Sequence, residues 1–162
     1  TGEVMGIDKD FGMAFAKSQI GSGSRIPTEG SVFVSVKDSD KDKILNPVSD
    51  LFSLGFDIYA TDGTAEFLNN NNIQTKKINK VLQGSPHIVE MISEKKISLV
   101  LNTTETPQAI KDSKSIRRSA LESETPYYTT VSGANAVVMA IKAIKNNEMS
   151  IKTIQSFGQL LS

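Results

Sequence analysis

The chain has 162 residues, of which 38% are hydrophobic and 22% charged, and its 18 basic and 18 acidic residues balance. This balance gives no reason to expect nucleic acid or an acidic membrane as a partner. The absence of cysteine excludes disulfides and thiolate catalysis, and a single histidine, His87, is a poor basis for a metal cluster. Since no apolar run approaches the roughly 18 residues that cross a bilayer and no signal peptide is visible, we expect a cytoplasmic protein.

The first 30 residues are predicted to form an arm that connects to a neighbouring domain. Apolar residues in 9–20 recur at helical spacing, and glycine, serine and proline then mark a loop up to residue 30. Because the sequence begins at Thr1 rather than methionine, we expect it to be a piece of a longer polypeptide. Residues 1–30 would then be the helix and linker, and 31–162 the main domain.

From residue 31 onward, predicted strands and helices alternate. The strands are expected at 32–36, 56–60, 74–78, 97–101 and 127–129. The helices are expected at 38–54, 63–68, 86–94, 112–123, 134–145 and 151–161. This alternation predicts an α/β fold, a doubly wound three-layer sandwich around a mostly parallel five-stranded sheet.

Individual residues refine these elements. Pro47 should kink the helix 38–54 or delay its regular start, and Pro86 is expected in the first turn of its helix. The short strand 74–78 is predicted at an edge of the sheet. The uniformly apolar strand 97–101 is predicted to be buried on both faces.

Hydroxyl, amide and lysine side chains follow the predicted strands. The segment Thr61-Asp62-Gly63-Thr64 turns a strand directly into a helix, which leaves backbone N–H groups and a positive helix end facing outward. Such a turn is suited to an anion, most naturally a phosphate. Since ligands of parallel sheets bind at the carboxyl ends of the strands, residues of the other strand ends should join it. These are Lys41, Lys80, Asn102, Thr103 and Thr104.

Each of these residues also has a purely structural interpretation. Thr61 is a typical helix cap, and lysines such as Lys41 and Lys80 are usually solvated surface charges. We expect His87 to cap or pack at the start of its helix, because no catalytic partner is evident beside it. Arg117 and Arg118 are expected to be surface charges on a helix.

Taken in order, these segments resemble one known family, the carboxy-terminal regulatory domains of bacterial carbamoyl-phosphate synthetase large subunits, within the methylglyoxal-synthase-like superfamily. No single motif is decisive, but the ordered set is specific and spans nearly the whole chain. The matching segments are Thr1 to Gly6, Ser35-Val36 with Asp40-Lys41, Ala60-Thr61-x-Gly63-Thr64-Ala65, Asn79-Lys80-Val81 with Gly84-x-Pro86-His87-Ile88, Asn102-Thr103-Thr104, Asp112-Ser113-x-x-Ile116-Arg117-Arg118, and Tyr127-x-Thr129-Thr130.

The resemblance implies a regulatory domain that does not itself catalyse. In the family, UMP inhibits and IMP and ornithine activate the ATP-dependent synthesis of carbamoyl phosphate for pyrimidine and arginine biosynthesis. It implies a parent enzyme, a glutamine-hydrolysing ligase, that uses ATP with Mg or Mn and K. It further implies that the domain works with the rest of the large subunit and with a glutaminase small subunit. No cofactor is expected in this domain.

The resemblance also assigns residues. Effector phosphate would bind to Lys41, Thr61, Thr64 and Lys80, and the nucleoside to Ser35, Asn102 and Thr104. Tyr127 and Thr129 would contribute to an ornithine site, and no catalytic residue or metal ligand is expected. One departure is Asp62 in the variable place of Thr-x-Gly-Thr, because a carboxylate pointing inward would repel a phosphate.

Two other functions remain as alternatives. A methylglyoxal-synthase-type lyase, which eliminates phosphate from dihydroxyacetone phosphate, needs a carboxylate base beside a carbon-bound proton. The segment in which the synthase places that aspartate, here residues 83–87, contains no acid, and only Asp62 and Glu105 are nearby substitutes. The second alternative is an interaction module that uses the arm 1–30, which would not require hydroxyls and lysines at strand ends.

Overall fold

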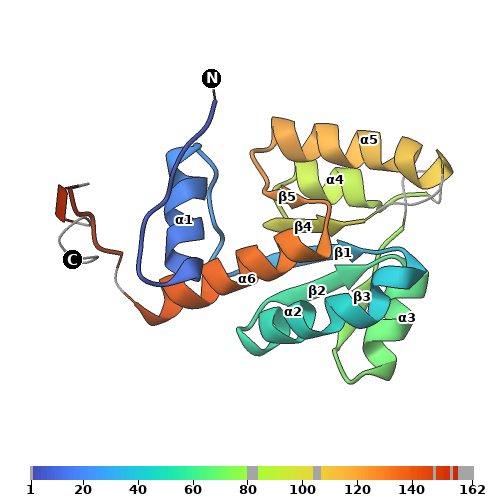
Figure 1. Ribbon diagram of the computed structural model, residues 1–162. Helices are drawn as coiled ribbons and strands as arrows, with labels where there is room; N and C mark the ends of the chain where they lie inside the picture. Colours follow the sequence, from blue (N-terminus) through green and yellow to red (C-terminus); the bar gives the residue numbers. More distant parts are fainter. Residues whose placement is uncertain (1, 80–83, 104–106, 148, 154, 157–162) are drawn as a thin grey trace.

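The computed structural model describes residues 2–79, 84–103, 107–147, 149–153 and 155–156, with 107–112 described by their backbone alone. Figure 1 shows helices on both sides of a central sheet. The strands are β1 (Ser31–Ser35), β2 (Asp57–Ala60), β3 (Thr75–Lys77), β4 (Leu99–Asn102) and β5 (Tyr127–Tyr128). The helices are α1 (Phe11–Gly21), the 3₁₀ turn η1 (Asp38–Asp40), α2 (Lys41–Ser53), α3 (Asp62–Asn70), α4 (Ile88–Ser93), α5 (Pro107–Glu122) and α6 (Val131–Asn146).

The five strands form one parallel sheet in the order β3-β2-β1-β4-β5. The chain first builds outward from β1 to β3 and then crosses back to place β4 on the other side of β1. The strand order therefore reverses between β1 and β4, where open α/β sheets bind ligands. The predicted parallel five-stranded sheet is confirmed, and β3 is an edge strand as expected.

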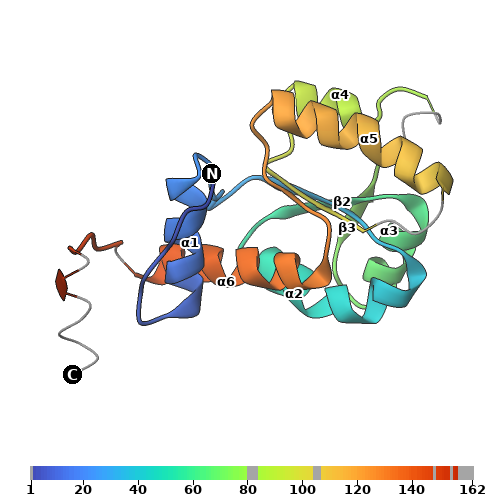
Figure 2. The ribbon, with the colours of Figure 1, turned by 45° about the horizontal axis from the view of Figure 1, so that its top comes forward.

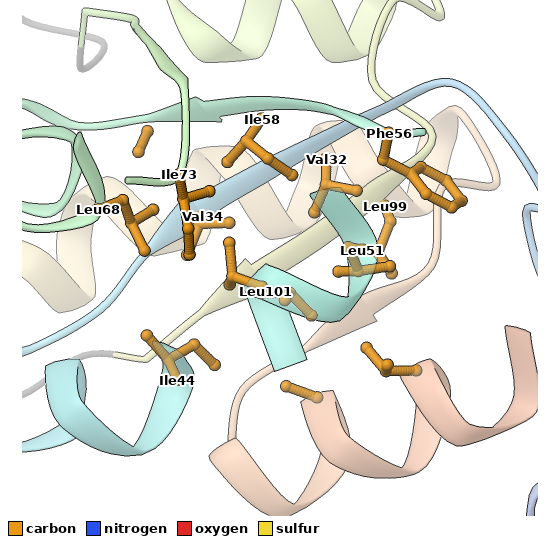
Figure 3. Close-up of a cluster of buried hydrophobic side chains, with 14 of the residues drawn as sticks. Val32, Val34, Ile44, Leu51, Phe56, Ile58, Leu68, Ile73, Leu99 and Leu101 are labelled. Atoms are coloured by element: carbon orange, nitrogen blue, oxygen red, sulfur yellow. The ribbon is translucent and has the colours of Figure 1, made fainter. Parts of the chain in front are cut away.

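The side chains of β1 show how the two faces of the sheet are filled. Val32 and Val34 join the core cluster beneath α2, α3 and α6, whereas Phe33 packs in the cluster beneath α4 and α5. This alternation follows from the two-residue period of a strand. Figure 2 shows the resulting three layers, and Figure 3 shows the cluster between the sheet and α2 and α6. The predicted three-layer sandwich is confirmed, as is the burial of β4 on both faces.

Several element boundaries differ from the sequence-based expectation. The predicted helix 38–54 starts as η1 and becomes α-helical at Lys41, with Pro47 buried inside it. Helix α4 begins at Ile88, so the prediction that Pro86 lies in its first turn is wrong. His87 caps α4 instead, as expected, through a reciprocal hydrogen-bond pair with Glu90.

The last predicted helix, 151–161, falls mostly outside the described residues, and its first part, 151–153, has no regular secondary structure. Within the described part of the chain, no helix combines the length and the apolar character that a bilayer crossing requires.

Helix α1 packs against α6 beyond one end of the sheet (Figure 1). The contact is close, since a Cβ added to Gly12 would lie 2.4 Å from the Met139 carbonyl oxygen. The hydroxyl of Tyr128 also donates a hydrogen bond of 3.1 Å to Gln19 of α1, and burial raises the pKa of Tyr128 to about 12. The first 30 residues therefore contribute packing to this domain, whereas their predicted connection to a preceding domain stays a prediction.

Replacing Gly12 by alanine should lower the free energy of unfolding by about 1–3 kcal/mol, because α1 or α6 must move to admit the methyl group. Gly21 provides a matched control in the same helix, since its added Cβ would meet only the Val4 Cβ, at 3.8 Å. Urea unfolding of both variants checks the prediction. If Gly12→Ala is as stable as Gly21→Ala, the close packing of α1 on α6 is not the arrangement in solution.

Candidate anion-binding site

The carboxyl ends of β1 and β4 meet at the point where the strand order reverses. Ser35 ends β1 and Asn102 ends β4, and the two residues are register partners. Thr103 follows Asn102, and its hydroxyl accepts a 3.1 Å hydrogen bond from the Lys37 backbone N–H. The loops that follow the two strands are thus fixed side by side, which places their polar groups at one edge of the sheet.

The N-terminus of α3 opens onto this edge without a side-chain cap. Thr61 is the N-cap residue, but its hydroxyl makes no capping bond and lies 3.3 Å from the Ser35 hydroxyl instead. Helices α1, α4 and α6 are each capped by a side chain, whereas the N–H groups of Asp62 and Gly63 have no acceptor among the described residues. Uncapped N–H groups and the helix dipole together favour an anion here.

Thr64 and Lys41 complete the surroundings of this helix end. The Thr64 hydroxyl is buried and accepts a 3.3 Å hydrogen bond from the Val36 N–H, so its own proton remains available to a ligand. Lys41, at the start of α2, places its Nζ 3.7 Å from the Cβ position of Gly63. Its ion pair with Asp38, at 2.8 Å, lowers the pKa of the Asp38 carboxyl.

The carboxylate of Asp62 does not join this group. Asp62 is 70% exposed and pairs across 3.7 Å with Lys77 on the edge strand β3. Its negative charge is therefore directed to the outer side of α3. The concern that Asp62 would repel a phosphate is thus not supported by its position.

The side chain of Asn102 is buried and makes two hydrogen bonds. Its Nδ2 donates to the Ser113 hydroxyl of α5 at 2.8 Å and to the Tyr127 hydroxyl of β5 at 2.7 Å. The Arg117 guanidinium lies 5.5 Å from the centre of the Tyr127 ring. Tyr127 is therefore hydrogen-bonded directly to the strand-end residue Asn102, although the resemblance assigns Tyr127 to another ligand.

Two clefts adjoin these residues. The first, of about 440 Å³, is lined by Lys37, Asp40, Lys43, Thr103 and residues 129–132 at the start of α6. The second, which we call the β5 cleft, has a volume of about 600 Å³ and lies between residues 22–24 and the β5 edge. Its lining includes Arg117, Glu124, Tyr127 and Thr129.

The structure brings together most of the residues assigned from the sequence. Ser35, Lys41, Thr61, Thr64 and Asn102 share the carboxyl edge, and Thr129 lines both clefts. Lys80, Thr104 and Glu105 lie outside the described residues. No group of three or more potential metal-ligating side chains occurs in the described part. Lys37 was not identified from the sequence as a cleft residue. It directly follows a predicted strand, so the reasoning applied to the other strand-end residues could have found it.

The fold and the site define a doubly wound α/β domain with a candidate anion-binding edge at its switch point. Residues 43–129, more than half of the chain, match the family model of the MGS-like domain. The chain belongs to the MGS-like domain family.

Curated relatives carry the name carbamoyl phosphate synthase large chain. The protein of Brucella suis is 48% identical over 157 residues, which are 97% of this chain and 14% of the relative. The protein of Mesorhizobium japonicum is 50% identical with the same coverage. A C-terminal section from Aquifex aeolicus is 46% identical over 145 residues, 90% of this chain and 27% of that protein. The chain thus spans about 14% of the length of the full-length relatives.

A solved methylglyoxal synthase from Elizabethkingia anophelis has a similar structure. Its TM-score is 0.57 at 18% identity, with 70% of this chain and 79% of the synthase covered. This likeness shows a shared fold.

Proposed function

We propose that this chain is the regulatory domain of a carbamoyl phosphate synthase large chain and that it binds nucleoside monophosphates at the carboxyl edge of its sheet. UMP is the proposed inhibitor and IMP the proposed activator. The high identity to large chains over 97% of this sequence supports the assignment of the domain. The site geometry supports the class of ligand.

The observation that carries the proposal is the uncapped start of α3 beside a lysine. Three kinds of polar group lie at the start of α3: the free N–H groups of Asp62 and Gly63, the hydroxyls of Thr61 and Thr64, and the Lys41 ammonium. Backbone N–H groups, hydroxyls and an ammonium are the groups that hold a phosphomonoester. Lys80 and Thr104 are proposed as further contacts to phosphate and nucleoside, and Ser35 and Asn102 would complete the nucleoside site.

The β5 cleft is the proposed place of the ornithine contribution, because Tyr127 and Thr129 both line it. Its other contacts would come from the remainder of the large chain. The parent enzyme would be a cytoplasmic ligase that uses ATP with Mg or Mn and K and works with a glutaminase small subunit. It would make carbamoyl phosphate for pyrimidine and arginine biosynthesis.

Three carboxylates near the site favour binding over proton abstraction. Asp38 and Asp62 are paired with Lys41 and Lys77. Glu90, close in sequence to the segment that holds the base in the synthase, accepts hydrogen bonds from the His87 N–H and the Ser85 hydroxyl, which lower the pKa of its carboxyl. A carboxylate stabilised in this way is a weaker base.

Calorimetric titration of the chain with UMP and IMP tests the proposal. We expect saturable binding, with affinity about 5- to 10-fold lower in Thr64→Val, since one hydrogen bond to the phosphate is lost. Thr75→Val is the matched control, because the only partner of this buried hydroxyl among the described residues is the nearby Ile73 carbonyl. Absence of binding at low salt would refute the nucleotide assignment. Phosphate release from dihydroxyacetone phosphate by the chain would instead establish the lyase alternative.

A further inference from the structure

The chain just beyond the end of β1 is held on both sides by threonine hydroxyls. The N–H group of Val36 donates to Thr64 at 3.3 Å, and the next N–H group, that of Lys37, donates to Thr103 at 3.1 Å. Strand β1 lies between β2 and β4 in the sheet. Because Thr64 comes from the helix after β2 and Thr103 follows β4, the two hydroxyls continue the hydrogen-bond ladder on the two sides of β1.

Thr103 is attached to the end of β1 at two points. Its N–H donates to the Ser35 carbonyl at 2.9 Å, and its hydroxyl accepts the bond from Lys37. The residue is only 8% exposed, and Lys37 is the one hydrogen-bond partner of its hydroxyl in the described part of the chain. Since backbone N–H groups that leave water need a partner, the Thr103 hydroxyl determines where Lys37 lies.

From Lys37 the chain turns directly toward Lys41. The Lys37 carbonyl accepts the Asp40 N–H at 3.0 Å, which closes the turn η1, and α2 begins at the next residue, Lys41. The Lys41 side chain is 23% exposed and reaches to within 3.7 Å of the Cβ position of Gly63. A side chain packed to this degree has limited freedom to compensate for a displaced backbone. The position of Lys37 therefore affects where the Lys41 ammonium lies.

We propose that Thr103 is a positioning residue of the phosphate site at the start of α3, because its hydroxyl holds the loop after β1 and so places the Lys41 ammonium. This inference rests on the proposed function. It gives Thr103 a role different from the ligand contact expected of a strand-end residue, since Thr103 acts through Lys41. The role matters for affinity because hydrogen bonds weaken steeply when their geometry is poor.

Titration calorimetry of Thr103→Val with UMP and IMP tests the proposal. We expect affinity about 3- to 10-fold lower than in the parent chain, because valine has nearly the same shape but cannot accept the Lys37 N–H. Thr103→Ser keeps the hydroxyl and should bind as the parent does. Thr75→Val is the matched control, since Thr75 is also a threonine of 8% exposure, and it should leave affinity unchanged.

The same substitution in a Lys41→Ala background separates a positioning role from a merely structural one. Because Thr103 acts through Lys41, Thr103→Val should cause no further loss of affinity there. A structural role would lower affinity equally in both backgrounds, or lower the free energy of unfolding and leave affinity unchanged. If Thr103→Val does not fold, Thr103→Ala removes the same acceptor and is expected to give the same results.

Three outcomes overturn the positioning role while the parent chain still binds nucleotide. These are unchanged or tighter binding by the variant without the hydroxyl, the same loss in both backgrounds, and an equal loss in Thr103→Ser. Failure of the parent chain to bind either nucleotide overturns the proposed function and this inference with it.

Discussion

Replacing Lys41 by alanine should lower the affinity of the chain for UMP and IMP by about 10- to 100-fold. A charge-assisted hydrogen bond contributes about 1.5–3 kcal/mol, and each 1.4 kcal/mol corresponds to a factor of ten. The partner of Lys41 in the free protein is Asp38, whose side chain is 93% exposed. Because such an exposed ion pair stabilises the fold very little, phosphate can replace it at small cost. Titration calorimetry of Lys41→Ala against the parent chain measures the effect.

Lys96→Ala is the control for a general effect of charge. Lys96 precedes β4, at the amino edge of the sheet, and pairs with Glu94 at 2.6 Å. Its removal changes the net charge by the same amount as the removal of Lys41, yet it should alter nucleotide affinity less than twofold. Equal losses in the two variants would indicate diffuse electrostatic attraction. No loss in Lys41→Ala would mean that the phosphate binds elsewhere than at the start of α3.

The layered fold follows from features that can be read directly from the sequence. Apolar runs such as Val32–Val36, separated by helical patterns of ordinary length, leave few alternatives to a parallel sheet with helices on both faces. The order of the strands could not be predicted in this way, because the alternation alone does not indicate that β4 crosses back to pair with β1. Element boundaries were least predictable where side-chain hydrogen bonds set them. His87 caps α4, so the helix begins after Pro86 and does not include it.

For the site, the sequence was sufficient to predict which residues share an edge of the sheet. Carboxyl ends of parallel strands meet at the same edge, so Thr61, Lys41 and Asn102 were expected near one another. The partner of the Thr61 hydroxyl was not predictable, because this hydroxyl could either cap α3 or contact the Ser35 hydroxyl. The bond between Asn102 and Tyr127 joins two residues 25 positions apart on neighbouring strands. Such contacts depend on strand order and register, which no local pattern encodes.

Replacing Phe33 by alanine should lower the free energy of unfolding by about 3–5 kcal/mol, as for other large-to-small changes in a core. Phe33 is fully buried in β1, the central strand, and packs in the cluster beneath α4 and α5. The loss is a large part of the roughly 5–15 kcal/mol that stabilises a typical domain. Urea unfolding measures it as a lower midpoint at an unchanged slope.

Two control variants separate cavity formation from the loss of apolar surface in general. Phe33→Leu keeps most of the volume and should cost less than about 1.5 kcal/mol. Leu121→Ala, at a side chain that is 80% exposed, should cost less than about 0.5 kcal/mol. If Phe33→Ala were as mild as Leu121→Ala, the cluster beneath α4 and α5 would not be a packed core.

The destabilised Phe33→Ala chain also offers a sensitive test of binding. A ligand that binds only the folded state at 100 times its dissociation constant raises the free energy of unfolding by about 2.7 kcal/mol. UMP at that concentration should therefore restore much of the stability that Phe33→Ala loses. The same concentration should have far less effect on a Phe33→Ala, Lys41→Ala double variant, because its binding is weaker. Equal stabilisation of both variants would show that UMP does not contact Lys41 and that the start of α3 is not its binding site.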